Sequence, residues 1–455
     1  MSDDSVTTPH LSRRDLLQAG AMALGIAAVG CAPGRGPPAP APALGPGPFA
    51  APPLDQVRIG FVGVGGMGTV HVRNLARIAG ARITAVCDVV EAHAVRAANI
   101  LTGAGHPAPR LYTRGPTDFL RMCETEDLDL VYTATPWEWH VPICVAAMRN
   151  GKHAATEVPA AVTMEEAWQL VEEAERYAKH CVMMENCNYD RMEMMVLNMV
   201  RQGVFGEILH AEGGYLHDLR EIKFSSEGEG LWRRAHSIRR NGNLYPTHGL
   251  GPVANCLDIN RGDRFDYLVS MSGPSRGLQA WAREHFPPDA PERAERYALG
   301  DVNMSLIRTV QGRTILVGHN TNLPRPYSRI HLVEGTKGLF QGYPNRVYVE
   351  GKSEEHRWDE AAKWLPDYEH PLWKFEAATR STEGHGGMDF LEDYRLIHCL
   401  RQGLPTDMSV YDAAALSAVS AASEASVANR SRPVDIPDFT RGRWQTLPPW
   451  GIVTP

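Results

Sequence analysis

The sequence predicts an α/β protein with an N-terminal, doubly wound parallel sheet and a C-terminal α+β domain built on an open, largely antiparallel sheet. Three observations predict this class. Short apolar runs alternate with helical stretches from residue 57 to residue 185. A glycine-rich turn directly follows the first apolar run. From about residue 186 the alternation is lost, and several strand-like runs follow instead.

The first strand is expected at Val57–Val62, and an amphipathic helical stretch ends at Ile78. Gly63 permits the tight turn between them, Gly65 lets the backbone approach a pyrophosphate, and Gly68 lets the helix pack close to the strand. The start of the helix attracts phosphate charge. This is the Rossmann pattern, and the alternative is a glycine-rich surface turn. The residues expected to hold a dinucleotide here are Gly63, Gly65, Gly66, Met67 and Gly68.

The second strand, Ala81–Cys87, ends at Asp88, twenty residues after Gly68. An acid at that position binds the adenosine ribose hydroxyls and repels a 2′-phosphate. The expected cofactor is therefore NAD rather than NADP, tightly bound with one molecule per chain.

Further strands are expected at 128–135, 152–157 and 181–184, with helices between them up to Asn150 and around 165–179. Parallel strands place ligands at their carboxyl ends, so Thr135, Glu157 and Glu185 should line the crevice beside the nicotinamide. The remaining cofactor contacts are expected at Thr135, Trp137, His140, Glu157 and Asn186.

The chain divides into a Rossmann domain at 55–185 and a substrate domain at 186–455. Strand-like runs in the second part lie at 208–215, 267–272, 302–310 and 314–319, and the helical stretch 410–429 is expected to pack back as a cover. Pockets form preferentially between domains, so the substrate should bind there. Pairing of two chains through the second sheet is also expected.

The N-terminal residues 1–31 resemble a twin-arginine export signal, with Arg13-Arg14 before a weakly apolar run that ends at Gly30. Cys31 fits a lipobox, and cleavage at Ala41–Ala43 is the alternative. Residues 32–54 form a proline-rich and alanine-rich linker. The twin-arginine translocase is thus an expected partner, and the location is periplasmic or lipid-anchored at the cell envelope.

Composition excludes several function classes. The formal charge of -7 is spread over 46 basic and 53 acidic residues without a long run of one sign, so nucleic acid is not an expected partner. Beyond Cys31, the cysteines form no CxxC pair and no cluster at metal-ligand spacing, so no disulfide framework and no metal are expected. They should be small buried side chains: Cys87, Cys123, Cys144, Cys181, Cys187, Cys256 and Cys399.

Three segments resemble the glucose-fructose oxidoreductase, inositol dehydrogenase and MocA family: Gly63–Gly68, Ala134–His140 and Gly151–His153. Most of that family carries Glu-Lys-Pro where this chain has Glu157-Val158-Pro159, and the resemblance implies that the lysine serves hydride transfer. Val158 cannot act as an acid or a base. This departure points to a hydrolytic branch of the family.

The branch that the chain resembles is glycoside hydrolase family 109, the NAD-dependent α-N-acetylgalactosaminidases. The resemblance runs from Val57 to the C-terminus and rests on Glu185–Tyr189, Trp232–Arg234, Tyr245–Pro252, Tyr327 and Gly384–Gly387. It implies hydrolysis by oxidation at sugar C3, elimination across C1 and C2, addition of water and re-reduction. The sugar contacts that it implies are Glu157, Tyr189, Arg233, Tyr245, His248 and Tyr327.

The residues themselves support part of this assignment. If Pro246 opens a helix, Tyr245 and His248 lie on one face, where a phenol and an imidazole can converge on a substrate hydroxyl. Histidine suits proton transfer near neutral pH. The expected catalytic residues are His248, Tyr189 and Tyr245, and the expected substrate contacts are Glu157, Arg233, Tyr245 and Tyr327.

Plainer interpretations stay open at this point. His248 could be a hydrogen-bonded core histidine, Glu157 a solvated carboxylate, and Arg233 half of a solvated basic pair. The whole chain could be a sugar or cyclitol dehydrogenase that releases NADH, or an inactive exported sugar-binding protein. The substrate is a small molecule or a glycan.

Overall fold

The computed structural model describes residues 49, 51–375, 383–451 and 453–454. The export signal and the lipobox predicted for residues 1–31, and most of the linker predicted for residues 32–54, lie outside these ranges. Among the described helices, none has the length and apolar character needed to cross a membrane.

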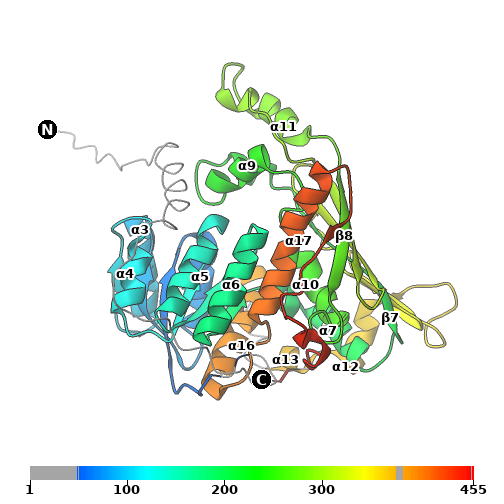
Figure 1. The fold of residues 1–455 in the computed structure, drawn as a ribbon, viewed down its shortest axis with the longest axis horizontal. Coiled ribbons are helices and arrows are strands. Elements are labelled where there is room, and N and C mark those ends of the chain that lie inside the picture. Colours follow the sequence, from blue (N-terminus) through cyan, green and yellow to red (C-terminus); the bar gives the residue numbers. More distant parts are fainter. Residues whose placement is uncertain (1–48, 50, 376–382, 452, 455) are drawn as a thin grey trace.

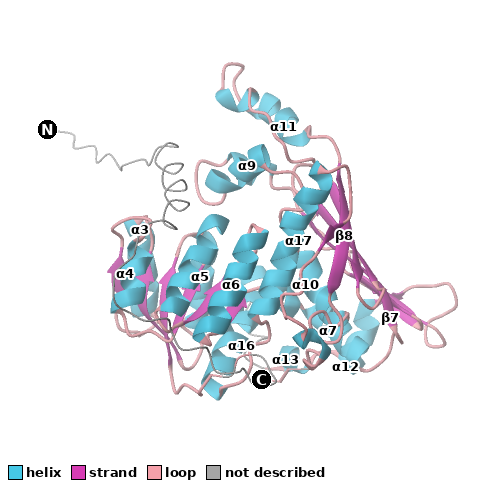
Figure 2. Cartoon of the chain, viewed as in Figure 1, coloured by secondary structure: helices cyan, strands magenta, loops and turns pink. Residues whose placement is uncertain are grey.

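The N-terminal domain contains a six-stranded, entirely parallel sheet in the order β3-β2-β1-β4-β5-β6. Helices cover it (Figure 2), so β1 and β4 are buried almost without interruption. The predicted doubly wound sheet is confirmed. The strands are β1 (Val57–Val62), β2 (Ala81–Cys87), β3 (Arg110–Tyr112), β4 (Leu130–Thr133), β5 (His153–Thr156) and β6 (Cys181–Met183), and the helices are α2 (Gly66–Leu75), α3 (Glu91–Gly103), α4 (Asp118–Thr125), α5 (His140–Arg149) and α6 (Met164–Tyr177).

The second sheet has nine strands in the order β14-β13-β12-β11-β7-β10-β9-β8-β15. Strands β7 and β10 pair in parallel, and every other pair among its described strands is antiparallel. The predicted largely antiparallel sheet is therefore confirmed. The strands are β7 (Ile208–Leu216), β8 (Phe265–Ser272), β9 (Asn303–Thr309), β10 (Thr314–Asn320), β11 (Leu332–Gly335), β12 (Gly338–Gln341), β13 (Arg346–Val349), β14 (Asp359–Glu360) and β15 (Val434–Asp435).

Two helices fill the space between the sheets. Helix α10 (Thr247–Cys256) packs on β7, and α17 (Val410–Ala428) packs against both α6 and β8 (Figure 1). A Cβ at Gly249 would lie 1.9 Å from the Gly214 nitrogen, so only glycine allows α10 to come so close to β7. The other helices are α7 (Arg191–Arg201), α8 (Arg220–Phe224), α9 (Gly230–Arg239), α11 (Gly277–His285), α12 (Leu365–Tyr368), α13 (Pro371–Lys374) and α15 (Glu383–Gly386).

Helix α16 (Met388–Gln402) returns to the N-terminal domain. It packs against α2, the helix that follows the glycine turn, although more than 300 residues separate the two (Figure 1). Side chains from the last part of the chain therefore reach the carboxyl ends of the parallel strands. Both domains thus supply side chains at the edge of the sheet where the crevice is expected.

Candidate active site

The glycine turn has the shape that a pyrophosphate requires. Gly63 has a φ of +81°, and a Cβ at Gly68 would lie 2.0 Å from the Gly63 carbonyl oxygen. A Cβ at Gly66 would meet nothing within 4 Å, and at Gly65 only the His93 ring at 3.9 Å, so the outer side of the turn is open. The start of α2 has no side-chain cap, which leaves its N–H groups for an anion. These residues fit a dinucleotide.

Asp88 supports this turn from the end of β2. Its two carboxylate oxygens accept hydrogen bonds of 2.8 Å from the backbone N–H groups of Val64 and Val90. The side chain is buried. Asp88 therefore fixes the loop in addition to its expected contact with the ribose.

Replacing Asp88 with Ala should lower the affinity for NAD about 10- to 100-fold. The expected size is that of the ribose contact, one charge-assisted hydrogen bond of about 1.5–3 kcal/mol, whereas the two lost bonds to the Val64 and Val90 N–H groups mainly loosen the loop. Isothermal titration of cofactor-free protein with NAD measures the change. Glu91→Ala, an exposed acid at the start of α3, is the matched control, and equal affinities of the two variants would contradict the role of Asp88.

His248 lies at the start of α10 and is paired with an acid that the sequence analysis placed in the crevice without giving it a role. The His248 Nδ1 atom is 2.7 Å from the Oε1 atom of Glu185, which lies just past the end of β6 and is fully buried. The Cys187 N–H donates to the same oxygen over 3.2 Å. Burial opposes the charge of Glu185, but His248 beside it holds the pKa of that carboxyl below its usual range.

Aromatic rings surround this pair. The centroid of the Tyr245 ring lies 4.9 Å from that of His248, and the Tyr215 ring lies 5.4 Å from His248 and 4.6 Å from Tyr245. Tyr327 contacts Tyr215 at 6.2 Å, and its hydroxyl accepts a hydrogen bond of 3.2 Å from Arg329. The fold thus brings Tyr245, His248 and Tyr327 together. Tyr215 links them, and its apolar strand gave no signal for such a role.

Arg233 is not a solvated basic residue. Its guanidinium carbon lies 4.8 Å from the centroid of the Trp232 ring, 5.3 Å from that of Trp137 and 5.2 Å from that of Tyr245. Its Nε atom donates to Glu229 over 2.5 Å. Rings hold the guanidinium on several sides, so Arg233 is a buried cation beside Tyr245. Trp137, expected at the cofactor, belongs to this cluster.

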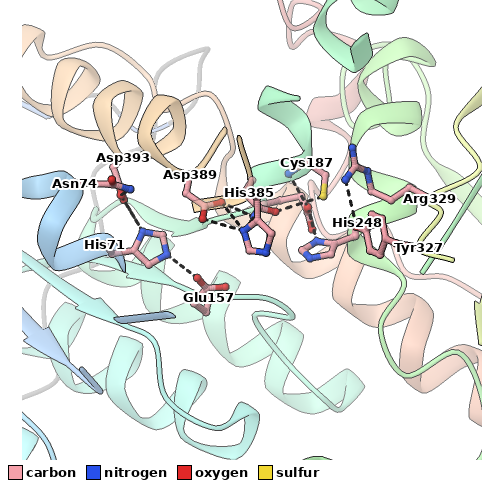
Figure 3. A network of polar contacts seen from close by, with 12 residues as sticks. His71, Asn74, Glu157, Cys187, His248, Tyr327, Arg329, His385, Asp389 and Asp393 are labelled. Atoms are coloured by element: carbon pink, nitrogen blue, oxygen red, sulfur yellow. Dashed lines mark hydrogen bonds and ion pairs between the residues drawn. The ribbon is translucent and has the colours of Figure 1, made fainter. Parts of the chain in front are cut away.

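Glu157 is held by a buried histidine (Figure 3). Its Oε1 atom is 2.7 Å from Nε2 of His71, on α2, and Nδ1 of His71 is 2.9 Å from Asp393, on α16. Tyr132 and Asn74 also donate to Asp393. Burial opposes the charge of His71, but the two carboxylates hold its pKa well above the usual range. This triad joins the crevice, the nucleotide helix and the second domain.

Three other predicted cofactor residues lie around the crevice. The ring nitrogens of the fully buried His140 are each 2.8 Å from a carbonyl oxygen, one of Thr135 and one of Pro159. Burial lowers the pKa of His140, and its neutral ring donates to one of the two. Asn186 donates to Asp389 of α16 over 2.6 Å, and His385 lies 2.9 Å from the other oxygen of Asp389. His140 and Asn186 therefore position the loops that surround the crevice.

Tyr189 has a different neighbourhood from His248. Its hydroxyl donates to Asp407 over 2.9 Å, and Asp407 forms an ion pair with Arg395. The ring packs with Met388 and Leu391 of α16 in a separate apolar cluster. Among the described contacts, none joins Tyr189 to His248 or Tyr245.

Glu392 is a buried acid near the triad of Glu157, His71 and Asp393, and the sequence analysis missed it. Both carboxylate oxygens lack a hydrogen-bond partner among the described residues. Burial raises the pKa of Glu392 well above its usual range, His71 opposes this, and the neighbouring Glu157 and Asp393 raise it further, so the protonated form is favoured.

Replacing Glu392 with Gln should stabilise the protein at alkaline pH. A pKa raised by folding means that stability falls as the pH rises from the unfolded value, about 4.3, through the folded one. A neutral amide removes this dependence and should gain on the order of 1 kcal/mol at pH 9. The melting temperatures of both proteins at pH 5 and pH 9 measure it. An equal difference at the two pH values would contradict a raised pKa.

The sequence matches two family models that divide it as the two sheets do. Residues 57–185 match the oxidoreductase family with an NAD-binding Rossmann fold, named for Gfo, Idh and MocA. Residues 189–446 match the C-terminal domain of glycosyl hydrolase 109. NAD is therefore the cofactor, and the open glycine turn fits it.

Relatives named glycosyl hydrolase family 109 protein align with most of the chain. A glycosyl hydrolase family 109 protein of Shewanella sp. (strain W3-18-1) is 50% identical over 410 residues, which cover 89% of each chain. One from Shewanella pealeana is 48% identical over 419 residues, or 90% of this chain and 92% of the relative.

Solved structures with the same fold are more distant. A levoglucosan dehydrogenase in complex with NADH and L-sorbose aligns with a TM-score of 0.63 and 22% identity, over 85% of this chain and all of that one. A scyllo-inositol dehydrogenase from Lactobacillus casei with bound NAD(H) and scyllo-inositol aligns with a TM-score of 0.59 and 15% identity, over 84% and 99% of the two chains. These likenesses concern the fold alone.

Proposed function

Because the chain belongs to glycosyl hydrolase family 109 and is a glycosidase with an NAD-binding domain, we propose that it hydrolyses terminal α-linked N-acetylgalactosamine, or a related hexose, by a redox route. In this route the sugar is oxidised at C3, the group on C1 is eliminated, water adds, and C3 is reduced again. The observation that carries the proposal is the His248–Glu185 pair, an acid–base group that lies past the end of a parallel strand, where the cofactor crevice is expected.

His248 is the proposed base for the C3 hydroxyl. A carboxylate can only accept hydrogen bonds, so Glu185 holds the proton on Nδ1 of His248 and leaves Nε2 to take a proton from the substrate. Bound NAD supplies reversible hydride transfer at C3. Because this chemistry regenerates the cofactor in each turnover, two carboxylates flanking the glycosidic bond are not required.

The other residues bind and orient the sugar. Burial raises the pKa of Tyr245 well above its usual range, so its phenol acts as a hydrogen-bond donor. Arg233, held among rings beside it, is placed for an electronegative substituent such as the acetamido oxygen. Glu157, held by His71, orients sugar hydroxyls. For the C2 proton we keep Tyr189, which would pass its phenolic proton to the carboxylate of Asp407 as it takes the proton from C2.

The test follows two products at once. Purified protein, with and without added NAD, is incubated with p-nitrophenyl α-N-acetylgalactosaminide while nitrophenol and NADH are measured. Release of nitrophenol without net NADH is expected. NADH that accumulates on free sugars without release of nitrophenol would instead indicate a dehydrogenase. If neither nitrophenol nor NADH formed with any glycoside of a panel, the protein would be an inactive sugar-binding protein.

We further propose export by the twin-arginine pathway, to the periplasm or to a lipid anchor at Cys31. The support is the pair Arg13-Arg14 before an apolar run. Fractionation of expressing cells, with mass spectrometry of the mature N-terminus, tests both. A full-length chain in the cytoplasm would contradict export.

Pairing of two chains through the nine-stranded sheet also remains a proposal. It is supported by exposed apolar side chains on neighbouring strands, Met271 of β8 and Met304 and Leu306 of β9. Light scattering of the wild type and of Leu306→Asp tests it, and a wild type that is monomeric at all concentrations would contradict it.

A further inference from the structure

The acid–base pair of Glu185 and His248 forms a cluster of three potential metal ligands with Cys187. Glu185, Cys187 and His248 each offer a donor atom, and these atoms all lie within 4.8 Å of one another (Figure 3 shows Cys187 and His248). Glu185 and Cys187 are almost fully buried, and the side chain of His248 is 13% exposed. The first two residues follow β6 and the third opens α10, so the fold assembles a cluster that has no metal-ligand spacing in the sequence.

The donor set suits one class of ion. A carboxylate, a thiolate and an imidazole are the usual ligands of zinc, and three protein ligands leave a fourth position open. Neighbouring ligands around a tetrahedral zinc ion lie roughly 3.3 Å apart, from bond lengths of about 2.0 Å. The 2.7 Å between His248 and Glu185 would therefore have to open by about 0.6 Å, as an ion replaced the shared proton.

A second observation points to a ligand here. The other carboxylate oxygen of Glu185, Oε2, is buried and makes no hydrogen bond of normal length among the described residues, although the nearby Thr247 hydroxyl helps to lower the pKa of that carboxyl. Buried polar atoms are normally satisfied by protein, water or an ion. Burial raises the pKa of the Cys187 thiol and Arg329 lowers it. Arg329 is itself paired with Asp190 over 3.0 Å, so the surrounding charges do not forbid a cation.

We propose that Glu185, Cys187 and His248 bind a thiophilic divalent cation of the zinc class, and that its binding inhibits the enzyme. An ion between Glu185 and Nδ1 of His248 takes the place of the proton on Nδ1, so the neutral imidazole carries its proton on Nε2 and cannot take one from the substrate. The inhibitory part rests on the proposed function, whereas the binding part does not. Zinc is then a reversible inhibitor, and a chelator restores activity.

Binding is tested without any activity measurement, by titrating the NAD-loaded protein with cobalt(II) as a spectroscopic probe. A thiolate-to-cobalt charge-transfer band in the near ultraviolet, saturating at one ion per chain and displaced by zinc, is expected. Cys187→Ser should lose the band. Cys256→Ser, which changes another buried cysteine at the end of α10, should keep it. No band in the wild type, or the same band in Cys187→Ser, would overturn the proposal.

X-ray absorption of the zinc-loaded wild type gives a readout that needs no variant, so a misfolded variant does not stop the test. One sulfur ligand together with nitrogen or oxygen ligands is expected, and a shell without sulfur would overturn the site.

The inhibitory part is tested by activity. Cys187→Ser should need at least tenfold more zinc for half inhibition of its own activity, and unchanged sensitivity would overturn that part. A cobalt band in a protein without glycosidase activity would support the site and contradict the proposed function.

Discussion

Replacing His248 with Asn is expected to lower kcat/KM for p-nitrophenyl α-N-acetylgalactosaminide by about 10²–10⁴-fold, the usual contribution of a general acid–base group. Asn keeps a polar side chain near Glu185 but has no group that takes up a proton at neutral pH. The affinity for NAD should change less than twofold, because His248 belongs to the second domain. Nitrophenol release and NAD titration of the same preparation measure the two quantities.

The matched control for this substitution is His210→Asn. His210 lies on β7, where its ring is 2.8 Å from the Thr314 hydroxyl. This variant should keep wild-type activity within about threefold, since surface polar contacts contribute little to catalysis or stability. A His248 variant that retains activity in the same range would remove His248 from the proposed mechanism.

Local patterns predicted the parts of the site that neighbouring residues build. The glycine turn could be read because each glycine has its own steric reason within one strand–turn–helix unit, and those reasons hold in the structure. Tyr245 and His248 could be paired because they lie three residues apart at a helix start, and their rings are 4.9 Å apart. The class of each sheet followed from hydrophobic periodicity, but the short strands β3 and β11 to β15 and the parallel pairing of β7 with β10 were not predicted.

Contacts between distant segments could not be predicted in this way. His71 is separated from Glu157 by 86 residues and from Asp393 by 322, so no spacing indicates that the three form one triad. Tyr189 shows the same limit, since its motif is local but the carboxylate that binds its hydroxyl comes 218 residues later. The partner of His71 depends on which helix from the end of the chain packs on the first domain. That helix is α16, and its sequence does not indicate this packing.

Replacing His71 with Gln should lower the free energy of unfolding by about 3–5 kcal/mol near pH 6, because breaking a buried ion pair leaves an uncompensated charge. The pKa of His71 is raised by folding, so its contribution is complete below the unfolded value of about 6.5 and is lost as the pH rises through the folded one. The difference between wild type and variant should therefore shrink at pH 9. Guanidinium chloride unfolding at both pH values measures it.

A second substitution separates the charge effect from simple loss of packing. Asp393→Asn in the His71→Gln background removes the carboxylate that the first change leaves unpaired, so it should restore part of the lost stability, whereas Asp393→Asn alone should destabilise. Activity gives an independent readout: Glu157 loses its partner in both His71→Gln proteins, so kcat/KM should stay low even where stability returns. If stability and activity recovered together, Asp393 and His71 would matter for folding alone, and Glu157 would not depend on the triad for its position.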